Sequence, residues 1–160
     1  MNLWIDIARP SLVQTIAGVD CLVLNDAELR QLTAKPNLIA AAHEVLSWGG
    51  PSVVIAKQGE YGAALVTDEH FFALPAFPLE TVIDPTGAGD TFAGGFIGYL
   101  SANATDGAPD APLLRRAMAY GTALASFNVE EFGTERVARL TEGEIGERVR
   151  DLASFTHFDL

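Results

Sequence analysis

Residues 84–91, DPTGAGDT, combine glycines and carboxylates in a pattern suited to phosphoryl transfer. Gly87 and Gly89 allow a loop to enter a helix with its backbone N–H groups turned inward, and such groups bind anions. The free amides and the positive end of a helix also stabilise charge on a phosphoryl group during its transfer. Asp90 follows these glycines and can take a proton from an attacking hydroxyl. We therefore predict a phosphate-binding turn with Asp90 as the catalytic base.

The same pattern also fits a simple tight turn before a helix. In that case Asp90 is a first-turn residue that improves helix stability by about 0.3 to 1 kcal/mol. The spacing matches neither the phosphate loop GxxxxGK[ST] nor the dinucleotide pattern GxGxxG, because Phe92 stands where the third glycine would be. Spacing alone is weak evidence, and for Gly-Ala-Gly by itself the simple turn is the favoured interpretation.

The longer string DPTGAGDTFAGGFIGYL, residues 84–100, closely resembles the C-terminal signature of PfkB-family carbohydrate kinases, which include ribokinase, fructokinase and adenosine kinase. The resemblance implies ATP as phosphate donor, Mg²⁺ as cofactor and a sugar or nucleoside hydroxyl as acceptor. It makes Asp90 the catalytic base and places Thr86 beside the anion hole. Pro85 stands where the family usually has Thr, a change that the signature tolerates. The amides implied to form the anion hole are those of Gly87, Ala88 and Gly89.

A second motif, Asn25-Asp26-Ala27-Glu28, follows an apolar run and matches the family's Asn-x-x-Glu, whose residues organise magnesium and phosphates, often through water. Asn25 is also a natural helix cap, and Glu28 can face a cation at the carboxyl edge of a sheet. Alone, such a pattern is usually a cap, but its place ahead of the signature favours the magnesium role. Asp84 is a weaker metal candidate, and family members often hold a monovalent cation such as K⁺ near this loop.

Residues 57–62, KQGEYG, resemble the family's glycine turn at the nucleotide site. Lys57 can approach a phosphate there, and a solvated turn lysine is an equal alternative. The family helix that corresponds to residues 113–128 covers the adenine. The residues implied in nucleotide binding are Thr86, Lys57, Gly59, Gly62, Gly121, Thr122 and Ala125.

Apolar strands and amphipathic helices alternate along the chain, which predicts an α/β protein. By resemblance, the fold is a ribokinase-like three-layer α/β/α sandwich, with a mostly parallel sheet and a β-hairpin. We expect Trp4, Trp48 and Phe96 in the core, and His43, His70 and His157 scattered at the surface. The predicted strands are 19–24, 52–56, 63–66 and 70–74, the last two forming the hairpin. The predicted helices are 11–16, 26–32, 37–48, 90–102, 113–128 and 141–155, with a polar loop at 103–112.

The composition of the chain limits the classes of partner that it can bind. The chain carries 10 Lys and Arg against 21 Asp and Glu, a net charge of −11, which argues against nucleic acid as a partner. Its only cysteine, Cys21, permits no intrachain disulfide and fits a reducing cytoplasm. No apolar run has the roughly 18 residues needed to span a bilayer, so we expect no membrane association.

The resemblance covers nearly all 160 residues, and we expect them to form one domain. The part of the family that these residues do not match is its N-terminal half, which carries the sugar-binding residues and the β-sheet lid. We expect Met1–Trp4 to lie at the end of a central strand, and the chain to be a fragment or a truncated reading frame. Exposed sheet edges would then favour homo-oligomers or association with the missing part. Two alternatives to a sugar or nucleoside kinase stay open: a nucleotide-binding module without turnover, and a vitamin kinase for pyridoxal- or hydroxymethylpyrimidine-like substrates.

Overall fold

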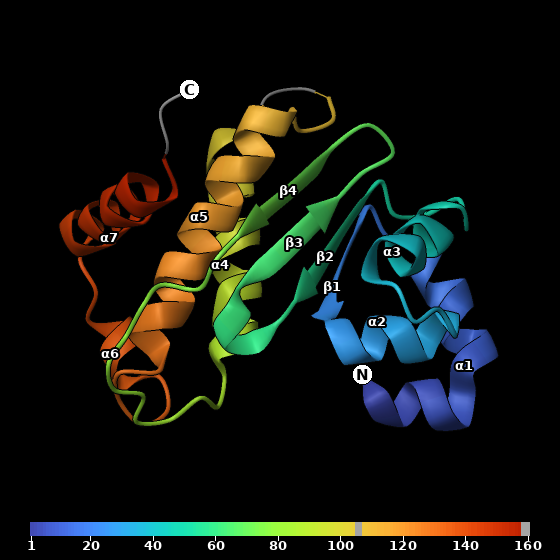
Figure 1. Ribbon diagram of the computed structural model, residues 1–160, viewed down its shortest axis with the longest axis horizontal. Helices are drawn as coiled ribbons and strands as arrows, with labels where there is room; N and C mark the ends of the chain where they lie inside the picture. The colour runs from blue at the N-terminus through green and yellow to red at the C-terminus, as the bar shows by residue number, and fades with distance from the viewer. Residues whose placement is uncertain (105–106, 158–160) are drawn as a thin grey trace. The chain divides into compact units, whose positions relative to one another are not determined.

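The computed structural model describes residues 1–104 and 107–157. Its chain divides into two compact units, residues 1–73 and 74–160. The first unit combines helices with a sheet, and the second consists mainly of helices (Figure 1). Within the described residues, no helix is both long enough and apolar enough to cross a membrane.

The first unit is built on a mixed sheet with the strand order β1-β2-β3-β4. β1 pairs with β2 in parallel, which requires the crossover through α2 and α3, and β2 pairs with β3 antiparallel. β3 and β4 form the predicted hairpin, and β4 ends at the boundary of the unit. The strands are β1 (Cys21–Asn25), β2 (Val53–Lys57), β3 (Ala63–Val66) and β4 (Phe71–Leu74), and the helices are α1 (Asn2–Ile16), α2 (Asp26–Thr33), α3 (Leu38–Leu46) and a short 3₁₀ turn (Gly59–Tyr61).

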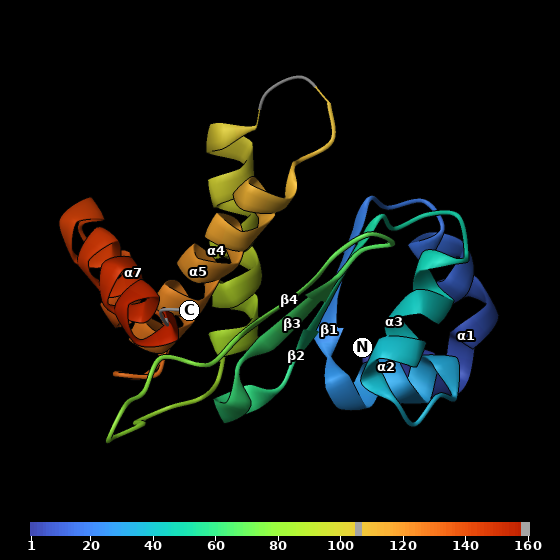
Figure 2. The ribbon, with the colours of Figure 1, turned by 45° about the horizontal axis from the view of Figure 1, so that its top comes forward.

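The helices of this unit cover one side of the sheet, as Figure 2 shows. Leu22 and Leu24 alternate with less buried residues along β1, so that one face of the strand enters the core. Leu29 and Leu32 of α2 are fully buried in the same cluster. Cys21 lies next to this core, where burial, and then the charge of Asp20, raise its thiol pKa to about 12.

The start of the chain differs from its prediction. Met1–Trp4 do not continue a strand, because α1 begins at Asn2 and merges two helical segments across a kink at Ala8 (φ −144°, ψ 34°). Pro10 explains the kink, since a proline removes a helical hydrogen bond and clashes with the preceding turn. The predicted core position of Trp4 is wrong, because its side chain is 57% exposed. Trp48 packs part-buried against the core and Phe96 is fully buried, as expected.

The second unit contains the helices α4 (Ala88–Asn103), α5 (Ala111–Asn128), α6 (Glu135–Ala138) and α7 (Glu142–Thr156). The three long helices confirm the prediction, and the short α6 was not predicted. The predicted capping box is present, with the Thr141 hydroxyl accepting the Glu144 N–H and the Glu144 carboxylate accepting the Thr141 N–H. Of the predicted loop 103–112, residues 105 and 106 lie outside the described part of the chain.

Helices α4 and α5 pack against each other through glycines. A Cβ atom on Gly121 would lie 2.8 Å from the Phe92 carbonyl oxygen and 3.2 Å from its ring. A Cβ atom on Gly95 would lie 2.7 Å from the Leu124 side chain and 3.1 Å from the Gly121 Cα atom. The two backbones therefore approach more closely than any side chain at these positions would allow.

A charged network joins α5, α6 and α7. Glu130 accepts hydrogen bonds from Arg136 at 3.3 Å and from Arg148 at 2.6 Å, and Arg136 also binds Glu144 at 2.8 Å. The Arg148 guanidinium lies 3.6 Å from the centre of the Phe127 ring, a close cation–π contact. These contacts hold α7 on the surface of α5.

We expect Gly121→Ala to destabilise the protein by about 1–3 kcal/mol, because the new methyl group overpacks the helix contact against backbone atoms. The matched control is Gly98→Ala, at an α4 position where a Cβ atom would meet nothing within 4 Å. That change should stabilise by about 0.5–1 kcal/mol through helix propensity. Urea unfolding of both variants checks the prediction, and equal effects would contradict the close approach of α4 and α5.

The charge of Glu144 should support folding at neutral pH but not in strong acid. Its hydrogen bonds to Thr141, and then to Arg136, lower the carboxyl pKa from 4.5 to about 2. Because the folded pKa is depressed, this stabilisation is fully present above pH 4.5 and is lost as the pH falls towards 2. Glu144→Gln should therefore unfold more easily than the wild type at pH 7, with the difference shrinking across this range.

The measurement is the free energy of unfolding in urea at a series of pH values. Glu142→Gln serves as the control because it removes a charge from the same first turn of α7. A Glu144→Gln deficit that does not depend on pH would contradict the assigned role of the charge.

Candidate phosphate-binding turn and neighbouring site residues

The turn before α4 is shaped by Asp84 and Gly87. Asp84 Oδ1 accepts the Thr86 N–H at 2.9 Å, and Oδ2 accepts the Gly133 N–H at 3.4 Å. The N–H of Thr86, its side chain and the N–H of Gly133 hold the Asp84 pKa below its ordinary value, so the carboxylate stays ionised. Gly87 is the N-cap of α4 at φ 83°, a left-handed conformation that favours glycine.

This turn leaves backbone amides open. The Ala88 N–H lies 3.3 Å from the Pro85 carbonyl oxygen, and the Thr91 N–H closes the first helical bond to Gly87 at 2.8 Å. In contrast, the N–H groups of Gly87, Gly89 and Asp90 donate no hydrogen bond to any residue in 1–104 or 107–157. Open N–H groups at the positive end of a helix form an anion-binding site. The turn therefore presents open amides, and the binding of a phosphate by them stays a prediction.

Asp90 lies in the first turn of α4 with an exposed side chain. Its carboxylate makes no hydrogen bond or ion pair to another residue in the described part of the chain. An exposed carboxylate without a competing donor is free to accept a proton from a hydroxyl placed beside the turn. Its position and freedom are therefore suited to a general base.

Asn128, which was not predicted as a site residue, ties this turn to the end of α5. Its Nδ2 donates to the Thr86 carbonyl at 2.8 Å, and its Oδ1 accepts the Thr91 hydroxyl at 2.7 Å. The side chain is only 1% exposed. One signal was available in the sequence: a single amide at the end of a helix of small and apolar residues, which needs a buried partner wherever that helix end is covered.

The predicted adenine-covering residues lie on α5. Gly121 and Thr122 are buried, and Gly121 provides the close contact with Phe92 described above. Ala125 is half-buried. The structure therefore gives Gly121 a packing role, and a part of these residues in nucleotide binding stays a prediction.

In the first unit, Asn25 and Glu28 form a complete capping box at the start of α2. Asn25 Oδ1 accepts the Glu28 N–H at 2.7 Å, and Glu28 Oε2 accepts the Asn25 N–H at 3.1 Å. Glu28 Oε1 also lies 2.9 Å from the amino group of Met1. Burial alone would raise the pKa of Glu28. The amino group of Met1, through its hydrogen bond and its charge, outweighs burial together with the N–H groups of Asn25 and Asn2, so the pKa is lowered.

The predicted glycine turn follows β2. Lys57 is the last residue of that strand, and the Gln58 N–H donates to the Gly62 carbonyl at 2.7 Å. Gly59 and Gly62 adopt φ values of 60° and 101°, in the left-handed region that favours glycine. The parallel register of β1 and β2 places Lys57 directly beside Asn25, at the end of the two strands. Two of the predicted motifs of the first unit thus meet at one edge of its sheet.

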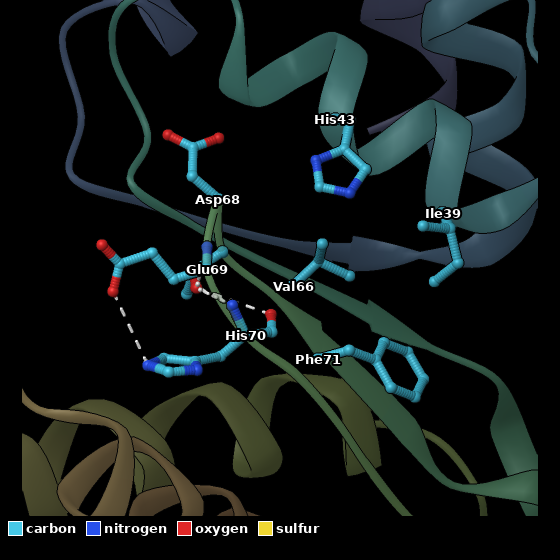
Figure 3. Close-up of a pocket in the computed structure, with 8 residues that line it drawn as sticks. Ile39, His43, Val66, Asp68, Glu69, His70 and Phe71 are labelled. Carbon is cyan, nitrogen blue, oxygen red and sulfur yellow. Dashed lines mark hydrogen bonds and ion pairs between the residues drawn. The ribbon is translucent and has the colours of Figure 1, made fainter.

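A separate hollow of about 270 Å³ lies between α3 and the β3–β4 turn (Figure 3). It contains none of the predicted site residues. His43 projects from α3, whereas the His70 ring points away towards Glu69, so the two imidazoles do not converge (Figure 3). Across residues 1–104 and 107–157, no three His, Cys, Asp or Glu side chains are grouped to hold a metal ion.

Known proteins resemble this chain in sequence. The model of the pfkB family carbohydrate kinases matches residues 2–139. A cytidine kinase of Thermococcus kodakarensis is 39% identical over 94 residues, which are 57% of this chain and 33% of that protein. A nucleoside kinase of Methanothermobacter thermautotrophicus is 32% identical over 130 residues, which are 80% of this chain and 37% of the relative. The chain thus spans about a third of the length of these curated relatives.

Solved structures share the fold. Aminoimidazole riboside kinase from Salmonella enterica, in complex with aminoimidazole riboside and an ATP analogue, superposes with a TM-score of 0.74 at 28% identity, over 90% of this chain and 46% of the kinase. Ribokinase from Thermotoga maritima gives a TM-score of 0.71 at 25% identity, over 86% of this chain and 44% of the enzyme. The predicted ribokinase-like α/β fold is thereby confirmed.

Proposed function

Because the chain belongs to the pfkB family of carbohydrate kinases, we propose that it carries the phosphoryl-transfer part of a kinase that moves the γ-phosphate of ATP to a hydroxyl group. The observation that carries this proposal is the turn before α4. There, three amides at Gly87, Gly89 and Asp90 are open, and the Asp90 carboxylate stands free beside them. Any helix leaves its first N–H groups without intrahelical partners, so the proposal depends on the free carboxylate beside these amides as well as on the amides themselves.

In this proposal the open amides bind the phosphoryl group as it is transferred. Charge spreads over its oxygens in the transition state, and fixed N–H donors stabilise that charge without reorganising. Asp90 accepts the proton of the acceptor hydroxyl as the oxygen attacks phosphorus. A positioned general base of this kind contributes about 10²- to 10⁴-fold to the rate.

ATP and Mg²⁺ fit the chemistry of the residues present. Mg²⁺ prefers oxygen ligands and retains waters, so Asn25 and Glu28 would organise it through water. The ionised Asp84 carboxylate is a candidate to support a metal, or a monovalent cation such as K⁺, near its loop. Magnesium in its complex with ATP neutralises phosphate charge. The residues proposed to contact the nucleotide are Thr86, Lys57, Gly59, Gly62, Gly121, Thr122 and Ala125.

The acceptor is proposed to be a sugar or a nucleoside. The relatives named above act on cytidine and nucleosides, and others that match this chain are a deoxyribokinase of Salmonella typhi and a fructokinase of Klebsiella pneumoniae. A pentose or hexose hydroxyl is the feature common to these substrates.

A second candidate is a nucleotide-binding module that transfers no phosphate. The observation that favours it is the coverage of 33% to 37% of the two curated relatives compared above. The matched third of the relatives contains the proposed phosphate turn, and such a part can bind ATP without holding an acceptor.

Calorimetric titration of the purified chain with MgATP separates these candidates. We expect binding, followed by ADP release that depends on one member of a panel of sugars and nucleosides. Binding without acceptor-dependent release would establish the nucleotide-binding module. A folded chain that does not bind MgATP would refute both.

Asp90→Asn should retain MgATP binding while lowering acceptor-dependent ADP release by at least about 10²-fold, because the amide cannot accept the proton. Asp151→Asn makes the same change on the exposed surface of α7 and should leave the rate unaltered. Unchanged turnover of Asp90→Asn would remove this residue from the role of base.

A further inference from the structure

Asn128 uses both ends of its amide to join two segments that are far apart in sequence. Its bonds reach the loop at Thr86, 42 residues away, and the helix at Thr91, 37 residues away. The Thr86 carbonyl can only accept, which fixes the orientation of the amide with Nδ2 towards it and Oδ1 towards the Thr91 hydroxyl. Because the side chain is 1% exposed, losing either partner would leave a buried polar group unsatisfied.

The bond to Thr86 bears directly on the open amides. In a continuous helix the Thr86 carbonyl would accept the N–H of the residue four positions later, which is Asp90. Here Thr86 precedes α4, its carbonyl accepts from Asn128, and the Asp90 N–H is unpaired within the described residues. A Cβ atom on Gly87 would lie 3.5 Å from the Asn128 oxygen, so the amide group lies beside the left-handed residue.

From these contacts we infer that Asn128 is the positioning residue of the phosphoryl-transfer turn. Its bond to the Thr86 carbonyl fixes the loop before α4, and its bond to the Thr91 hydroxyl fixes the first turn of α4. The three open amides and Asp90 lie between these two fixed points. Asn128 does not touch the reacting atoms itself. This inference rests on the proposed function only where it names the phosphates of ATP as the bound anion. The role of Asn128 in fixing the conformation of the turn does not depend on that function.

The test uses Asn128→Asp in the whole chain. The carboxylate matches the amide in size and still accepts from Thr91, but it cannot donate to Thr86. We expect hydrogen exchange at the Thr86, Ala88 and Thr91 amides to accelerate by about tenfold or more, and MgATP affinity to fall by a similar factor.

Two further variants and a control make the result specific. Thr91→Val removes the other bond and should show the same pattern, whereas Thr91→Ser keeps the hydroxyl and should preserve wild-type behaviour. Ser126→Ala removes a buried hydroxyl of α5 that bonds Ala123 and Arg148 away from the turn. It should leave exchange in the turn unchanged. If Asn128→Asp does not fold, Thr91→Val decides the question.

Wild-type exchange at the turn in a folded Asn128→Asp or Thr91→Val protein would overturn the inference. Faster exchange with unchanged MgATP affinity would also overturn it, because the turn would then not hold the phosphates. If the wild type binds no MgATP, the proposed function fails, and the exchange comparison alone decides whether Asn128 positions the turn.

Discussion

The second unit depends on how closely α4 and α5 approach each other. Gly95 and Gly121 leave no room for side chains between the two backbones, and this brings the end of α5 beside the start of α4. At that end the Val129 carbonyl accepts the Ile83 N–H at 2.8 Å, and Asn128 reaches Thr86 and Thr91. A wider helix spacing would pull all of these partners away from the turn. The packing glycines thus set the geometry of the residues proposed for chemistry, although they lie a full turn or more away from them.

Binding a polyanion with a chain of net charge −11 requires a local source of positive potential. Arg136 and Arg148 do not supply it, because both are committed to Glu130 and, in the case of Arg136, also to Glu144. Backbone amides at a helix N-terminus supply it instead, since they act over one turn and are independent of the net charge. The ionised Asp84 beside them adds negative charge, so a cation near that loop is physically favourable.

The sequence was most informative where a local rule decides the structure. Apolar runs between turn residues located the strands of the first unit, and the capping residues Asn25 and Thr141 located the starts of α2 and α7 within a residue. The turn before α4 was predictable because Gly87 and its neighbours define it locally. The role of Asn128 was not predicted, because its partners Thr86 and Thr91 lie about 40 residues away in the sequence. A local sequence pattern does not show that such distant residues are in contact. The start of α1 was not predicted either: Met1–Trp4 were expected at the end of a strand and Trp4 in the core, but these residues begin a helix on which Trp4 is exposed.

Glu28 caps the start of α2, and the proposed function also gives it a part in organising a cation. Its Oε2 accepts the Asn25 N–H, and this bond fixes the start of α2 at the carboxyl end of β1. Direct ligation of a magnesium ion by that oxygen would compete with the capping bond, because the short distances of an octahedral Mg²⁺ site demand a specific orientation of each ligand. Contact through a bound water avoids this competition, since a carboxylate oxygen has a second lone pair and the water adjusts to the geometry of the ion. A motif that caps a helix and also organises a cation is therefore expected to act on the cation indirectly, and the pKa of Glu28, held below its ordinary value, keeps the charge that such a contact needs.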